Sequence, residues 1–230
     1  MNRHPLHDVG RRVLAAVVLL GASACGSAPP PPPPAPAAAP APVAPTSNDP
    51  LAREAIGIFR SKRFDLALPL PAGKGFAIDD RSTPWLVARH EASRSTLLVR
   101  RWRELEVMTR EGCEQAARNG RALPTLDAAE ILEVRSLHIP PDHDTEATVA
   151  LFRPAPRAPA TTAPLYGMVL AFGAWSRQCF AYAFVTEHDG TGAEAIVAER
   201  LVRMVDQSLA QIRARSDLDP ALEREARPGP

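Results

Sequence analysis

Proline is concentrated in one segment of the chain, and this limits how much of the chain can fold. Eleven of the 25 prolines lie between Pro29 and Pro50. Repeated proline fixes φ and removes backbone donors, so this segment cannot join a sheet and favours polyproline II geometry. Residues 25–49 are therefore predicted to form a Pro/Ala-rich stalk, in which Pro29 to Pro45 alone would span about 50 Å at roughly 3.1 Å per residue. Residues 50–215 remain for a single folded head.

The first 24 residues have the parts of an export signal. Arg3, Arg11 and Arg12 form a basic start, and the apolar run VLAAVVLL follows from Val13. A run this short behind basic residues is typical of a secretory signal and not of a membrane span. Residues 1–24 are therefore predicted to be a signal peptide.

The string LGASAC, which ends at Cys25, resembles the lipobox of bacterial lipoproteins. The resemblance implies that Cys25 is lipidated, with palmitate as an expected acyl chain, and becomes the first residue of a membrane-anchored mature protein. Gly26 follows the cysteine, where many lipoproteins of the inner membrane carry Asp. The expected location is therefore the outer membrane, with the head facing the periplasm or the cell surface. A secreted protein cleaved after Ala24, with Cys25 as a free thiol, is the alternative.

Charge and hydropathy exclude two classes of protein. The formal net charge is only +1, which argues against a polybasic nucleic-acid binder. No apolar run reaches 18 residues, which excludes a transmembrane bundle.

The head shows apolar alternation typical of strands, with turn-forming residues between the runs. A middle helix is expected between the early and late strands, with Val107, Met108, Cys113, Ala116 and Ala117 on one side and its end near Gly120. The predicted strands are 64–70, 76–79, 84–91, 95–102, 130–139, 148–154, 165–172 and 178–186.

The last element of the head is predicted to be a long amphipathic helix of about 22 residues. Thr191 and Glu194 have capping-box spacing, and apolar residues then recur at three- and four-residue intervals from Val197 to Ile212. Residues 216–230 are polar and are predicted to be a disordered tail.

Together these elements predict an α+β head, an antiparallel sheet with a middle helix and the C-terminal helix packed on it. The element order, with an early strand ending in LPLP and Trp85 shortly after, resembles the Mog1/PsbP-like fold over residues 64–213. The chain also resembles uncharacterised lipoproteins of high-GC bacteria. Neither resemblance brings catalytic residues with it.

Two cysteines remain once Cys25 is assigned to lipid. An exported domain favours disulfides, so Cys113 and Cys179 are predicted to form a bridge between the middle helix and a late strand. Two buried free thiols or a redox-active pair are the alternatives, although CxxC spacing is absent.

The densest polar cluster runs from His138 to Glu146 and contains two histidines and three carboxylates. These groups suit a divalent metal, but two prolines interrupt the spacing, and a solvated turn is the competing interpretation. His90-Glu91 begins HExxR and so lacks the last ligand of a zinc protease. GxSxG, P-loop and GxGxxG motifs are absent, so no catalytic residue and no cofactor site is predicted.

An arginine-rich stretch with Trp102 interleaved is a third candidate, either a solvated sheet face or a contact for an anionic ligand or the cell wall. Trp175 in a predicted hairpin loop is either an exposed contact residue or an anchor for that loop. The arginines are Arg89, Arg94, Arg100, Arg101, Arg103 and Arg110.

The sequence therefore predicts a membrane-anchored envelope lipoprotein with a non-enzymatic binding or structural head. Its expected partners are the membrane, through the lipid, and an envelope protein or the cell wall, with no nucleic acid. An envelope enzyme, a hydrolase or a metal-dependent protein that uses His138 to Glu146, is the alternative.

Overall fold

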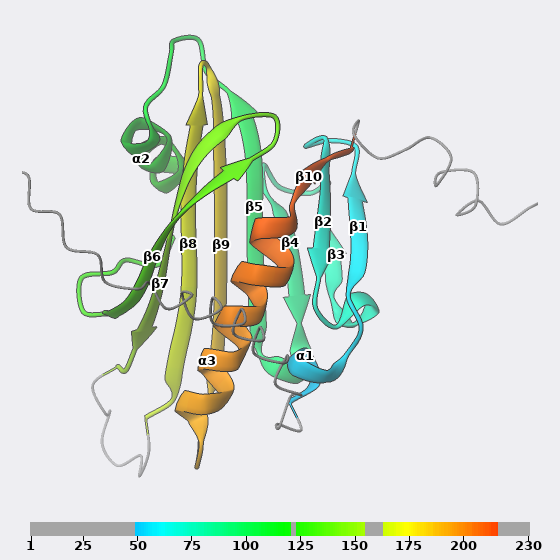
Figure 1. Cartoon of the computed structure of the whole chain (residues 1–230), viewed down its shortest axis with the longest axis vertical. Helices are drawn as coiled ribbons and strands as arrows, with labels where there is room; N and C mark the ends of the chain where they lie inside the picture. Colours follow the sequence, from blue (N-terminus) through cyan, green and yellow to red (C-terminus); the bar gives the residue numbers. More distant parts are fainter. Residues whose placement is uncertain (1–48, 121–122, 155–162, 216–230) are drawn as a thin grey trace, which may run out of the picture. The chain divides into compact units, whose positions relative to one another are not determined.

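The computed structural model describes residues 49–120, 123–154 and 163–215. The predicted signal peptide, Cys25, the stalk before Asp49 and the tail 216–230 lie outside the described residues. Strands dominate the described part, and they form two antiparallel sheets (Figure 1). The α+β class is therefore confirmed, with two sheets where one was expected.

The larger sheet has seven strands in the order β3-β4-β5-β9-β8-β7-β6. Its middle strands are apolar on both faces, and β9 is buried from Cys179 to Phe184. Burial on both faces explains why these strands read as continuous apolar runs in the sequence. The strands are β3 (Ala77–Asp79), β4 (Leu86–His90), β5 (Ser95–Arg103), β6 (Glu130–Ile139), β7 (His143–Phe152), β8 (Leu165–Trp175) and β9 (Gln178–His188).

One face of the larger sheet is covered by the small sheet and by the C-terminal helix. The small sheet has the order β1-β2-β10, with β1 at Gly57–Ser61, β2 at Leu66–Leu70 and β10 at Arg213–Ala214. All five residues of β2 are buried. Helix α3 (Ala193–Arg203) packs on β8 and β9. The helix lies so close to β8 at Gly167 that a Cβ there would be 2.3 Å from Val197 Cγ1, so only glycine fits at this position. The main core lies between these layers.

The opposite face carries α2 (Arg110–Gly120), which packs on β8 and β9. A second, smaller core lies under it and includes Trp85, Leu98, Ala117, Leu170 and Phe172. The middle strands of the larger sheet are thus buried on both faces, which accounts for their apolar composition, whereas β6 at the edge is largely exposed.

Several local predictions need correction. Helix α1 (Pro50–Arg53), β1 and β10 were not expected. Val107 and Met108 precede α2 and do not belong to it, and Val107 is exposed. The prediction of a capping box at Thr191 and Glu194 is wrong, because Gly192 is the N-cap of α3 and no side chain caps the helix.

The C-terminal helix is also shorter and less regular than predicted. After α3, the chain continues as a π-helical turn at Met204–Ser208 and a 3-10 turn at Leu209–Gln211. Met204, Val205 and Leu209 remain fully buried through this change. Apolar spacing alone does not distinguish these helical forms, because each keeps the same residues on the core side.

Candidate functional site

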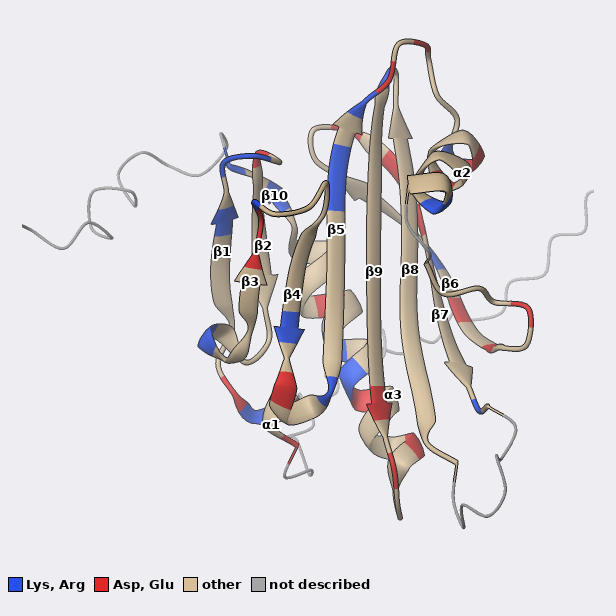
Figure 2. Ribbon diagram, turned by 180° about the vertical axis from the view of Figure 1, so that it is seen from behind, with Lys and Arg blue, Asp and Glu red and all other residues tan. Residues whose placement is uncertain are grey.

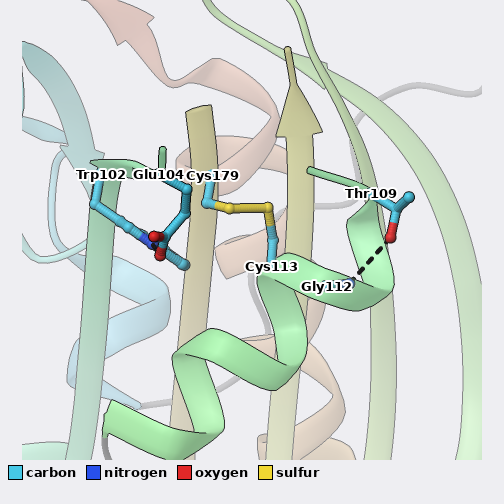
Figure 3. Close-up of a disulfide and its surroundings, with 6 residues drawn as sticks. All are labelled: Trp102, Glu104, Thr109, Gly112, Cys113 and Cys179. Atoms are coloured by element: carbon cyan, nitrogen blue, oxygen red, sulfur yellow. Dashed lines mark hydrogen bonds between the residues drawn. A yellow bond between two sulfur atoms is a disulfide. The ribbon is translucent and has the colours of Figure 1, made fainter. Parts of the chain in front are cut away.

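Cys113 and Cys179 form a disulfide, as predicted (Figure 3). Cys113 lies on α2 and Cys179 near the start of β9, and both are fully buried. The bond attaches α2 to the sheet, and its burial keeps it from thiol reagents, so its role is structural. Cys25 lies outside the described residues, and its lipidation stays a prediction.

The structure does not assemble a metal site from His138 to Glu146. His138 pairs with Asp144 across the β6–β7 hairpin, and Ile139 pairs with His143. Neighbouring residues of a strand point to opposite faces, so His138 is exposed whereas His143 is fully buried. Among the described residues, no group of three or more His, Cys, Asp or Glu is placed to hold a metal ion.

His143 has a structural environment instead. Its Nδ1–H donates to the Ile139 carbonyl oxygen at 3.2 Å, and its ring packs near Trp175 and Phe180. Burial lowers the pKa of His143, so the ring is neutral at pH 7. Trp175 was predicted to lie in the hairpin loop, but it is the last residue of β8, paired with Gln178, and its side chain is 39% exposed.

The arginine-rich stretch does not converge on one site. Arg94 pairs with Glu187 at 3.0 Å and Arg110 with Glu146 at 3.4 Å, on different elements. The Arg100 guanidinium lies 4.7 Å from the centre of the Trp102 ring. These arginines are distributed over separate parts of the sheet, as expected of a solvated surface.

A buried ion pair ties the start of the head to α3. Asp49, which the sequence analysis assigned to the stalk, is 7% exposed and accepts hydrogen bonds from Arg200 through both oxygens. Arg200 also donates to the Ser93 carbonyl oxygen at 2.8 Å and to Thr186 Oγ1 at 2.7 Å. The packed head therefore includes Asp49.

His90 belongs to the same buried network. Its Nδ1 lies 2.8 Å from Ser93 Oγ, and Ser93 Oγ lies 2.7 Å from Ser95 Oγ. Burial lowers the pKa of His90, which opposes the effect of Glu54 and Asp49. All three side chains are closed off from solvent, so this network fixes the fold and presents no reactive group.

The open feature of the head is a groove between β1 and β3. These strands are edge strands of different sheets, and neither has a strand partner on the side that faces the groove. The groove has two adjoining parts, of about 900 Å³ and 590 Å³, and both are lined in part by Phe59 and Ile78. We refer to them as the basic end and the apolar end of the groove.

The basic end has four basic and two acidic side chains in its lining. Figure 2 shows basic segments at the end of β1 and in the turn that follows it. Arg63 holds this end together, because its Nη1 donates to the carbonyl oxygens of Asp80 at 3.1 Å and of Thr83. The charged lining residues are Arg60, Lys62, Arg63, Asp79, Asp80 and Arg81.

The two carboxylates at the basic end already have local partners. Asp79 Oδ1 accepts the backbone N–H groups of Ser82 and Arg81, and these hydrogen bonds lower the pKa of Asp79. Asp80 Oδ2 accepts from Ser61 Oγ at 3.3 Å. Because carbonyl oxygens bind Arg63 without cancelling its charge, the lining keeps an excess of positive charge.

Arg60 and Lys62 contribute most directly to that excess. Within the described part of the chain, the buried Nε of Arg60 has no hydrogen-bond partner, although a buried donor normally has one. Lys62 is exposed and forms no ion pair with another described residue. Lys62 is therefore available to an anionic ligand, and Arg60 adds positive charge to the lining beside it.

The apolar end is lined by aliphatic and aromatic side chains from β1, β2 and the segment before β3. Ile56 is 41% exposed and Ile58 is 59% exposed, which is unusual for large apolar side chains. At this end of the groove, the backbone at Gly57 lies very close to the backbone at Gly73. A Cβ on Gly57 would lie 2.7 Å from Gly73 Cα, so no side chain fits between the strand and the turn there. The polar side chains that line the groove, with Glu54 and Lys74 at this end included, are carboxylates, lysines and arginines.

The sequence analysis missed this groove. Its basic end is visible in the sequence only as Arg60 to Arg63, three basic residues around one serine, next to a predicted strand. That signal is weak, because the groove depends on β1 lying beside β3, about twenty residues further along the chain.

Comparison with known proteins gives fold likeness only. No family model and no curated protein matches the chain. The structure is similar to the Ran-binding protein Mog1p of Saccharomyces cerevisiae, with TM-score 0.46 and 7% identity over 70% of this chain and 96% of that chain. It is also similar to a Bacteroides thetaiotaomicron VPI-5482 protein, with TM-score 0.39 and 12% identity over 71% of this chain. This chain spans about half the length (50%) of the latter.

The α+β class itself rests on the strands and helices described above. Within the described ranges, no helix is long and apolar enough to cross a membrane.

Proposed function

We propose that the chain is a lipid-anchored envelope protein whose head binds an extended segment of another envelope protein in the groove between β1 and β3. The observation that carries this proposal is a groove that is basic at one end and apolar at the other, between two strand edges without partners. The preferred segment combines acidic and apolar side chains.

Two physical properties of the groove support this partner. Strand edges offer backbone donors and acceptors to an extended segment, which gives affinity that does not depend on sequence. Arg60 and Lys62 then select a carboxylate at the basic end, and Ile58 and Phe59 select an apolar side chain beyond it. Charge near the rim also speeds the encounter with an acidic partner.

Crosslinking inside the native envelope tests the binding surface. A photo-crosslinking amino acid at position 58 or 62 should capture the same partner, because both positions border the groove. The matched control is position 202, since Val202 is also 59% exposed but lies on α3. Equal capture from position 202, or capture of unrelated proteins from positions 58 and 62, would refute the proposal.

A charge reversal tests the chemistry of recognition. Lys62→Glu should reduce the crosslink from position 58 several-fold, because it places a carboxylate where the partner's acidic group binds. Arg103→Glu makes the same change in charge at another exposed residue and should leave the crosslink unchanged. Equal losses from both variants would show that only net charge matters.

The anchor is a separate part of the proposal. Cys25→Ser should move the protein from the membrane fraction to the soluble fraction and abolish incorporation of labelled palmitate. Membrane association of the Cys25→Ser variant would refute lipid anchoring and leave the groove proposal intact. Separation of inner and outer membranes on a density gradient tests the expected outer-membrane location.

A further inference from the structure

The unpaired edge of β6 is the second open strand edge of the larger sheet. Strand β6 is ten residues long and pairs only with β7 within the described part of the chain. Proteins commonly protect such an edge with a short strand, a bulge, proline or charged side chains, lysine above all. Residues 130–139 contain neither lysine nor proline, and the protection that this edge has is a bulge near Leu132 and the charged Glu130, Glu133 and Arg135.

This edge also exposes large apolar side chains. Ile131 and Leu132 are each 45% exposed, and Val134 is 56% exposed. A register shift between Ile131 and Glu133 makes Leu132 the extra residue of a bulge. The regular part of the edge therefore runs from Glu133 to Ile139, and Val134 is the large apolar side chain exposed near its start.

The charges on either side of Val134 can pair with the same charges of a second copy of the chain. Glu133 precedes Val134 and Arg135 follows it. If two β6 strands pair antiparallel about a twofold axis at Val134, Glu133 of each copy lies opposite Arg135 of the other. The neighbouring registers, with the axis at Glu133 or at Arg135, place like charges opposite each other, which is unfavourable.

Arg135 is already oriented for such a contact. Its Nε donates to Glu133 Oε1 at 2.8 Å, and its Nη1 donates to Asp206, next to α3. The side chains of Glu133 and Arg135 remain 43% and 35% exposed. Pairing of two copies would extend this ion pair into a square of four alternating charges on one face of the joined sheet, with the two Val134 side chains next to each other on the opposite face.

We propose that two copies of this chain associate through β6, antiparallel, about a twofold axis at Val134. The contact is isologous, so each copy contributes the same residues, and it joins the two larger sheets into one. The bulge keeps the paired segment short, so the dimer forms only at high concentration, such as that of proteins anchored in one membrane. This inference does not depend on the groove.

Charge-swapped variants provide a specific test. The protein is the mature chain with Cys25→Ser, studied by analytical ultracentrifugation from about 5 μM to about 1 mM. Glu133→Arg and Arg135→Glu should each weaken self-association at least tenfold, because each sets like charges opposite each other. A mixture of the two variants should associate as a heterodimer at least as well as the unchanged chain, because every opposed pair is then complementary.

Matched controls separate this pairing from general charge effects. Glu91→Arg and Arg103→Glu make the same changes at exposed residues away from β6, and their mixture should behave like each variant alone. Thermal unfolding of each variant shows whether it is folded. A monomer at every concentration, or a mixture of the β6 variants that gains nothing, would overturn the proposal.

A cysteine on the axis gives a second, independent readout. Opposed Cα atoms of antiparallel strands lie about 4.5–5.5 Å apart, within the range that a disulfide spans. Val134→Cys should therefore form a covalent dimer under mild oxidation, whereas Val202→Cys, at an equally exposed valine on α3, should not. Equal rates of dimer formation for both variants would contradict pairing at Val134.

Discussion

Reduction of the disulfide between Cys113 and Cys179 is expected to release α2 before the rest of the head unfolds. Helix α2 has 11 residues, and only Cys113 and Ala117 are classed as buried on it. An isolated helix of this length is marginal in water. Its attachment to the sheet therefore depends more on the covalent bond than on packing.

The magnitudes support this order of events. The cysteines are 66 residues apart, and in the chain-entropy model a loop of that length contributes about 4 kcal/mol to the free energy of unfolding. The buried methyl group of Ala117 contributes only about 0.8 kcal/mol. Loss of the bond therefore lowers the stability of the whole head, and α2, which has only two buried side chains, is the element expected to loosen first, while the main core on the other face is unchanged.

Because the buried bond is shielded in the folded head, the protein is reduced in urea and refolded in reductant. Urea denaturation of the oxidised and reduced forms measures the global effect, and hydrogen exchange locates it. We expect the free energy of unfolding to fall by about 4 kcal/mol. Protection of amides in residues 110–120 should fall first, whereas β8 and β9 stay protected. The Cys113→Ala/Cys179→Ala variant is the control and should not respond to reductant.

Two outcomes would refute this reasoning. If the reduced protein loses less than about 1 kcal/mol, the chain-entropy account does not apply to this loop. If α2 keeps its amide protection after reduction, the helix is held by packing that the burial of two residues does not explain.

Three other perturbations test the core. Burial lowers the pKa of both His90 and His143. The contribution of these histidines to stability should therefore be fully present above pH 7 and should fall as pH decreases through about 6.5, by up to about 1.4 kcal/mol per pH unit for each histidine. Urea denaturation at several pH values measures this slope. Gly167→Ala should destabilise the head by about 1–3 kcal/mol, because its Cβ would meet Val197, and a double-mutant cycle with Val197→Ala should show positive coupling in thermal unfolding. Arg200→Met should cost about 3–5 kcal/mol in urea denaturation, because it leaves a buried carboxylate without its cation.

Strand positions were predictable because burial leaves a direct pattern in the sequence. Residues 165–172 and 178–186 were both assigned to strands, and both lie in the buried strands β8 and β9 of the larger sheet. The disulfide was predictable for a different reason, since an even pair of cysteines in an exported domain has few other uses.

The division into two sheets was not predictable, because it depends on contacts between distant strands. Strand β2 is buried at every position, as β4 nearly is, so composition does not assign them to different sheets. The cap of α3 failed for a local reason. Gly192 adopts a left-handed φ of 79° and takes the N-cap position, one residue after the expected Thr191.

The groove and the β6 edge were hidden from the sequence for a common physical reason. Each lies at a strand edge that has no neighbouring strand among the described residues. Hydrophobic periodicity indicates which face of a strand is buried, but not whether the edge of that strand is paired. Only the sheet order shows that β3 and β6 are the two ends of the larger sheet.

That order has a consequence for the two proposed contacts. Five strands separate β3 from β6, so a dimer formed through β6 leaves the groove beside β3 open in both copies. A dimer locked by Val134→Cys should therefore crosslink its partner from position 62 as efficiently per chain as the unlocked protein. If both grooves bind segments on the same surface, the locked dimer should also dissociate more slowly from that surface. Loss of the crosslink on locking would show that the two contacts compete, which this strand order does not allow.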